Sequence, residues 1–145
     1  MYGITHKVYG YKIHGMDSSS NNSEKIIKVF LEHYEDELIE YKEDCIKNGF
    51  DRGDEYSVLT DFLSEDDDLF WPYSGDDREG AFGIAIDEAA EFDSKEMRAL
   101  FKDESVSSDL LNEYSEYLKK FPSDLVDKII LECGEPSIIY IHGTS

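Results

Sequence analysis

The residues from Ser23 to Gly49 carry the longest unbroken helical pattern in the chain, and this pattern constrains the fold more than any other. Apolar side chains recur at alternating steps of four and three residues, which draws one stripe along a helix. The stripe consists of Ile27, Leu31, Tyr34, Leu38, Tyr41 and Cys45. Ser23 can cap the first turn, and Gly49 stands where a left-handed residue commonly ends a helix. The sequence therefore predicts one amphipathic helix over residues 23–49.

The opposite side of the same predicted helix is acidic. It carries Glu32, Asp36, Glu40 and Glu43. The first three are four residues apart, and each such like-charge pair costs about 0.2–0.5 kcal/mol of helix stability. Because this face repels itself, we expect it to serve a purpose other than folding.

The rest of the chain contains strand and helix patterns in mixed order. Alternation of apolar and polar residues predicts strands near residues 4–14, 56–62, 81–87 and 137–142. The last of these is apolar on both faces and is predicted to be central in its sheet. Helices are expected over 94–104, from 107 or 108 to 121, and over 123–133. The sequence thus predicts a single α+β domain over residues 1–145, with a small, mainly antiparallel sheet packed against about four helices.

Local signals mark the ends of these elements. Asp93, Ser107 or Ser108, and Ser123 are predicted N-caps, and Gly134 is expected to end the last helix. Gly10 lies inside the first strand, where glycine marks a bulge or a close approach of another backbone.

The balance of charge restricts the partners. The chain has 14 Lys and Arg residues against 34 Asp and Glu residues, a formal net charge of -20. That exceeds the magnitude of about 2–8 that suffices for solubility of a small domain. Nucleic acids and anionic membranes are polyanions, so neither is expected as a direct partner, whereas a basic protein surface is. The alternative is that the acidic residues only keep the protein solvated and have no role in binding.

The sequence shows no pattern typical of export or of membrane insertion. No basic region followed by an apolar run marks a secretory signal, and no stretch approaches the ~20 apolar residues of a membrane span. Cys45 and Cys133 both fall on apolar helix faces, which favours buried free thiols over a disulfide. We therefore expect a cytoplasmic protein.

A long loop between the second and third predicted strands combines acidic clusters with three aromatic residues. Loops of this length are usually functional or disordered. The expected partner-binding residues of this loop are Glu65, Asp66, Asp67, Asp68, Phe70, Trp71, Tyr73, Asp76, Asp77 and Glu79. Tyrosine and tryptophan are favoured anchors of protein interfaces. The alternative is that the aromatic side chains only pack the loop onto the core.

Catalytic and metal-binding motifs are weak. His142, Gly143 and Thr144 have the His-x-Thr spacing of two-histidine phosphoesterases, but the second copy is missing. The acidic clusters lack the order of an EF-hand loop, and no phosphate-binding loop or nucleophile elbow is present. The sequence therefore predicts no metal and no cofactor, and it favours binding over catalysis.

An enzyme remains the alternative to a binding protein. If the first and last strands are neighbours, His6, His14 and His142 could meet beside a carboxylate. Such a site would suit a small hydrolase or a nucleotide-degrading enzyme.

In size, charge and aromatic content, the whole chain resembles the small acidic antagonists made by bacteriophages and mobile elements, among them DNA-mimicking anti-restriction and anti-CRISPR proteins. Toxin-neutralising immunity proteins share this profile. The resemblance implies an inhibitor that covers a basic, nucleic-acid-binding partner such as a nuclease or a defence effector. Carboxylates about 6 Å apart along a helix would then stand in for phosphates.

The expected oligomeric state is a monomer or a homodimer. The apolar stripe spans fewer heptads than the three to four that a coiled coil needs, so its burial within the monomer is preferred.

Overall fold

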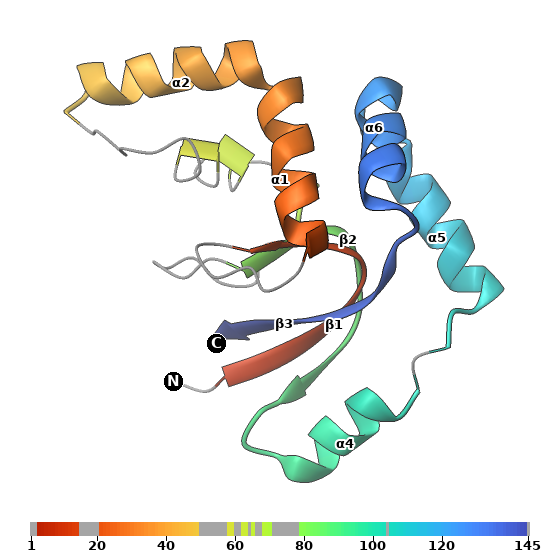
Figure 1. The fold of residues 1–145 in the computed structure, drawn as a ribbon. Helices are drawn as coiled ribbons and strands as arrows, with labels where there is room; N and C mark the ends of the chain where they lie inside the picture. The colour runs from red at the N-terminus through yellow and green to blue at the C-terminus, as the bar shows by residue number, and fades with distance from the viewer. Residues whose placement is uncertain are drawn as a thin grey trace.

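A computed structural model gives the fold of the chain (Figure 1). It describes residues 3–14, 21–49, 58–59, 62–63, 65, 68–70, 79–103 and 105–144. The strands are β1 (Gly3–His14), β2 (Glu79–Ala90) and β3 (Ser137–Thr144). The helices are α1 (Asn21–His33), α2 (Glu35–Lys47), α4 (Ser94–Lys102), α5 (Ser108–Leu118) and α6 (Ser123–Cys133).

The three strands form one antiparallel sheet in the order β2-β1-β3. Helices α1, α5 and α6 gather at one end of this sheet, and α4 lies at the other end (Figure 1). The α+β architecture predicted from the sequence is therefore confirmed. No helix among the described residues has the length and apolar content that crossing a bilayer requires.

The position predicted for the last strand is wrong, because β1 occupies the centre and β3 lies at the edge of the three-stranded sheet. Both faces of β3 make apolar contacts although it is an edge strand. Ile141 packs with Val8 on one face, and the ring of Tyr140 lies 4.5 Å from that of Phe101 on the other. Apolar residues on both faces of a strand therefore do not require a central position.

The strand predicted near residues 56–62 is wrong for the three residues of that range that the structure describes, 58, 59 and 62. The described residues of this segment and its end are helical, and none of them is paired in the sheet. Val58, Leu59 and Leu63 are buried, and Phe62 is partly buried. Apolar residues at i, i+1, i+4 and i+5 follow the helical period, which outweighs the weak alternation in this segment.

The long helix predicted over residues 23–49 is two helices. The chain turns sharply at Tyr34, whose φ of -102° and ψ of 22° interrupt the helix, and α2 leaves at a steep angle to α1 (Figure 1). Glu35, Asp36 and Glu37 form the first turn of α2. Acidic side chains stabilise a helix N-terminus through the helix dipole but repel one another inside a helix. This run of three acids is the signal for the break.

The main core lies between the sheet and the helices α1, α5 and α6. Tyr9, Tyr11 and Ile13 alternate along β1 and are buried on the side facing these helices. Phe82 of β2 is fully buried at the centre of this cluster, with the rings of Tyr11, Phe30, Tyr117 and Phe121 at 4.7–6.3 Å. Aromatic packing thus joins the sheet to α1, to α5 and to the connection between α5 and α6.

The prediction of a close backbone approach at Gly10 is confirmed. Gly10 lies opposite Gly83 of β2, and a Cβ atom at Gly10 would lie 2.1 Å from the carbonyl oxygen of Phe82. The register shift of the sheet occurs elsewhere, between Lys7 and Val8. A pair of facing glycines therefore lets the two strands approach without side chains.

Most helix-end signals are confirmed. The side chain of Asp93 accepts from the backbone N–H groups of Lys95 and Glu96 at 3.0 and 3.2 Å, and that of Ser107 accepts from Leu110 at 3.1 Å. Both Gly49 and Gly134 have positive φ just past a helix. Two caps were predicted wrongly.

Ser123 is the first residue of α6, after an N-cap at Pro122 that makes no side-chain capping bond. The fixed φ of Pro122 prepares the chain for a helix without a capping hydroxyl. Ser23 lies inside α1, which begins two residues earlier at Asn21.

Candidate functional site

Helix α2 presents the strongest concentration of negative charge among the described elements. Six of its 13 residues are acidic and two are lysines. Leu38 is its one buried residue, and Tyr41 and Cys45 are partly buried on the same side. At 100° per residue, Asp36 and Glu43 therefore point away from the protein body.

The outward side of α2 carries what we call the acidic row: Asp36, Glu40 and Glu43. All three side chains are exposed. No ion pair joins any α2 carboxylate to a cation in the part of the chain that the structure describes. The row keeps the i, i+4, i+7 spacing that the sequence predicted for it.

Glu32 does not belong to this row. It lies in α1, on the other side of the break at Tyr34, and its carboxylate is 3.5 Å from the ammonium group of Lys128 in α6. The even spacing predicted from Glu32 to Asp36 required one continuous helix, so the structure does not produce it. Lys128 also offsets the charge of Glu32.

The described part of the acidic loop lies partly against the body. Glu65 is exposed, and Asp68 is half-buried. The carbonyl oxygen of Asp68 accepts a hydrogen bond of 2.7 Å from the Tyr117 hydroxyl, and its carboxylate lies 3.8 Å from Lys120. The remaining predicted residues are outside the described residues: Asp66, Asp67, Trp71, Tyr73, Asp76, Asp77 and the side chain of Glu79.

Phe70 packs the loop onto the sheet. Its backbone pairs with Ala81 of β2 through two hydrogen bonds of 2.9 and 3.0 Å. Its ring is partly buried against the cluster of Val8, Ala81 and Ile141, 5.2 Å from the ring of His6. Phe70 therefore packs the loop onto the body. This is the alternative that the sequence analysis set against a role in partner binding.

The bend between α1 and α2 creates a groove of about 400 Å³ that the sequence did not indicate. Its apolar lining comes from Leu31, Leu38, Ile39 and Val58, and its charged lining from Lys28, Lys42, Glu32 and Glu35. A straight helix would have no such groove. The acidic run at the start of α2 is the one sequence signal for the bend, and therefore for the groove.

His6 and His142 do not share one site. His6 pairs with Ile141 across the sheet, and His142 pairs with Thr5, so His6 and His142 lie on opposite faces. The side chain of His14 is outside the described residues. Among the described residues, no group of three or more His, Cys, Asp or Glu side chains could hold a metal ion.

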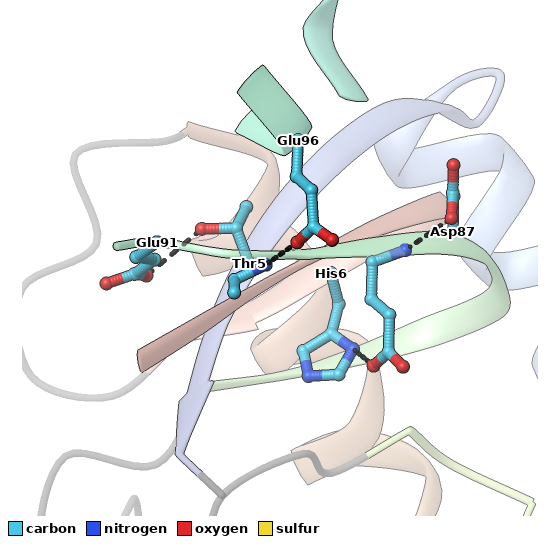
Figure 2. A network of polar contacts seen from close by, with 7 residues as sticks. Thr5, His6, Asp87, Glu91 and Glu96 are labelled. Atoms are coloured by element: carbon cyan, nitrogen blue, oxygen red, sulfur yellow. Dashed lines mark hydrogen bonds and ion pairs between the residues drawn. The ribbon is translucent and has the colours of Figure 1, made fainter. Parts of the chain in front are cut away.

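Each of these two histidines has its own carboxylate. His6 Nδ1 lies 3.4 Å from Glu88 Oε2 (Figure 2), and burial lowers the pKa of His6 although Glu88 acts in the opposite direction. His142 Nδ1 lies 2.6 Å from Glu91 Oε1, which also accepts a hydrogen bond of 3.0 Å from the Thr5 hydroxyl.

The Glu91 cluster ties three parts of the fold together. The hydrogen bond from His142, and then that from Thr5, lower the pKa of Glu91. Thr5 is fully buried, so its hydroxyl cannot reach a substrate. Figure 2 shows the neighbouring contact in which Glu96 of α4 accepts from the backbone N–H of Ala90 at 3.1 Å. These contacts secure the turn between β2 and α4.

Comparison with known protein families, with curated proteins and with solved structures finds no match to this chain.

Proposed function

We propose that this protein is an acidic inhibitor that acts in the cytoplasm by binding a basic, nucleic-acid-handling partner protein, such as a nuclease or a defence effector. The acidic row of α2 (Asp36, Glu40 and Glu43) is the centre of the binding surface. Inhibitors of this kind occur among bacteriophage anti-defence proteins and among immunity proteins.

One observation supports this proposal most. The carboxylates of the acidic row are exposed, and none of them forms an ion pair with a cation among the described residues. Like charges four residues apart weaken a helix, so the row has a cost in stability that binding can offset. In a helix, side chains at this spacing are about 5–6 Å apart, which is near the phosphate spacing along one DNA strand.

The net charge of -20 supports the same role at longer range. A strongly charged surface attracts a partner of opposite sign and speeds diffusional encounter by a factor of about 10 to 1,000. The same charge repels nucleic acid, so the inhibitor would compete with DNA for the partner without binding DNA itself.

A displacement assay tests the proposal. Labelled duplex DNA is bound to each member of a panel of purified basic nucleases and defence effectors, and its fluorescence anisotropy is followed as this protein is added. We expect release of the DNA from at least one member, with an apparent affinity that falls as salt rises.

A matched pair of variants locates the surface. The triple variant Asp36→Asn, Glu40→Gln and Glu43→Gln removes the acidic row. Exposed ion pairs contribute about 0.2–1 kcal/mol each, so loss of three should weaken displacement roughly three- to hundred-fold. The control makes the same charge change on α5 and α6: Glu113→Gln, Asp127→Asn and Glu132→Gln. All three control residues are exposed.

The control should displace DNA nearly as well as the unmodified protein. If both triple variants weaken displacement equally, net charge alone accounts for the effect and the acidic row is not the binding surface. Displacement that is indifferent to salt, or none from any member of the panel, would refute the proposal.

A further inference from the structure

Helix α4 is the one described helix with a positive net charge. It carries Lys95, Arg98 and Lys102 against the single acid Glu96 within nine residues. The whole chain has only 14 basic residues. Such a concentration of cations in so acidic a protein points to a specific local purpose.

The three cations lie on one outward side of α4, which we call the basic row. Leu100 is buried and Met97 is partly buried against the sheet. At 100° per residue, Lys95, Arg98 and Lys102 project to the opposite side. No ion pair holds any of these three within the described part of the chain.

An exposed aromatic side chain flanks the basic row, and two more exposed apolar residues lie just outside α4 in sequence. Phe101 within α4 is 44% exposed, and Phe92, two residues before the start of α4, is 70% exposed. Phe101 is placed beside the row by its contact with Tyr140 of β3, at a ring distance of 4.5 Å. Val106, shortly after the helix, is 41% exposed. Aromatic residues beside cations are typical of protein interfaces.

Helix α2 has the complementary arrangement. Its acidic row of Asp36, Glu40 and Glu43 is flanked on one side by Ile39 and Ile46, which are 54% and 53% exposed. Both rows extend over eight residues, which is seven steps and about 10 Å along a helix. The two helices lie at opposite ends of the molecule, so they cannot contact each other within one chain (Figure 1).

We infer that α4 of one molecule docks in antiparallel orientation on α2 of a second copy of this chain. In this orientation Lys95 lies opposite Glu43, and Arg98 lies opposite Glu40. The helix dipoles also oppose each other, which an antiparallel pair favours.

The antiparallel orientation is selected by the apolar flanks as well. It brings Phe101 of α4 next to Ile39 of α2, on the same side of the contact. In the parallel orientation, the apolar residues of the two helices would fall on opposite sides. Charge and apolar contacts therefore favour the same docking geometry.

Repulsion between two acidic molecules limits the conditions under which this contact forms. At an ionic strength of about 0.15 M the Debye length is about 8 Å, so distant charges are screened while touching rows still attract. At about 0.01 M the Debye length is about 30 Å, and the repulsion between whole molecules dominates. We expect association to be stronger at about 0.15 M than at 0.01 M.

The inferred contact uses the acidic row that is also proposed to bind the partner, but its test needs only this protein, so it can fail while the displacement assay succeeds, and the reverse. Sedimentation velocity of the purified protein at roughly 0.15 M salt and up to about 1 mM tests it. We expect species heavier than the 16.7 kDa monomer, in proportion that rises with concentration. A monomer throughout this range would overturn the inference.

Charge reversal identifies the contacting helices. One variant reverses the basic row with Lys95→Glu and Arg98→Glu, and the other reverses the acidic row with Glu40→Lys and Glu43→Lys. Each variant alone should associate at least about tenfold more weakly, because like charges then face each other. An equimolar mixture should associate again, because each reversed helix meets its complement on the other variant.

A control separates the contact from net charge. Lys25→Glu and Lys28→Glu on α1 change the charge as much as the basic-row variant does, and both lysines are exposed. This control should associate nearly as well as the unmodified protein. Circular dichroism establishes that each variant is folded. A mixture of folded variants that stays monomeric, or a control as weak as the basic-row variant, would overturn the proposed contact.

Discussion

Replacing Tyr117 by phenylalanine removes one hydroxyl that joins three parts of the fold. This hydroxyl accepts a hydrogen bond of 3.2 Å from the buried backbone N–H of Gly83 in β2, and it donates one of 2.7 Å to the carbonyl oxygen of Asp68. Phenylalanine retains the ring, whose contacts with Phe82 and Phe121 at 5.5 and 5.1 Å should persist. The change therefore isolates two hydrogen bonds from aromatic packing.

The expected loss can be worked out from these two bonds. The N–H of Gly83 would be left buried without its acceptor, which costs about 1–3 kcal/mol, and loss of the bond to Asp68 adds about 0.5–1.5 kcal/mol. We therefore expect the free energy of unfolding to fall by about 2–4 kcal/mol. A domain of this size is stable by about 5–15 kcal/mol, so the variant should fold but melt at a distinctly lower temperature.

Chemical denaturation followed by circular dichroism measures this loss. The matched control is Tyr9→Phe, since Tyr9 is equally buried and its hydroxyl makes no hydrogen bond with a described residue. The control should lose well under half as much stability. If both variants lose the same amount, the hydroxyl of Tyr117 does not join the loop to the sheet as argued.

Three further predictions concern pH and backbone packing. Because its hydrogen bonds lower the pKa of Glu91 in the fold, Glu91 stabilises the protein above the pKa of an unfolded glutamate, and this stability is lost as pH falls through the lowered pKa. Denaturation midpoints of Glu91→Gln should therefore depend less on pH in the acidic range; an unchanged dependence would contradict this assignment. Burial raises the pKa of Tyr11 to about 12, so stability should fall as pH rises above about 10, where an unfolded tyrosine ionises, and Tyr11→Phe should reduce that fall. The Cβ of Gly83→Ala would lie 2.3 Å from the carbonyl oxygen of Tyr9, and the forced strand shift should cost about 1–3 kcal/mol in denaturant titrations. A neutral Gly83→Ala would show that the strands can separate freely.

Local signals predicted the ends of most helices, because capping depends on neighbours in sequence. Asp93, Ser107 and Gly134 act as the sequence indicated. Periodicity does not reveal the break at Tyr34, because the apolar stripe continues across it; only the acidic run that follows disfavours one continuous helix. The central position of β1 depends on pairing between distant segments, which no local pattern encodes.

The candidate site divides in the same way. The helical period alone places Asp36, Glu40 and Glu43 on the exposed side of α2. For these residues the sequence was enough to predict exposure. The separation of His6 from His142 depends on the register between β1 and β3, which places them on opposite faces. The bend groove and the apolar flanks of α4 likewise appear only when the elements are assembled.

The strand order has a consequence for synthesis of the chain on the ribosome. Gly3 of β1 lies opposite Thr144 of β3, so the central strand emerges well before its second neighbour, with all the other described elements made in between. Pairings between such distant segments close slowly, and exposed strand edges meanwhile favour aggregation. The strong mutual repulsion of nascent chains at a net charge of -20 would keep them apart during this delay. The acidity can thus protect the protein before any fold exists.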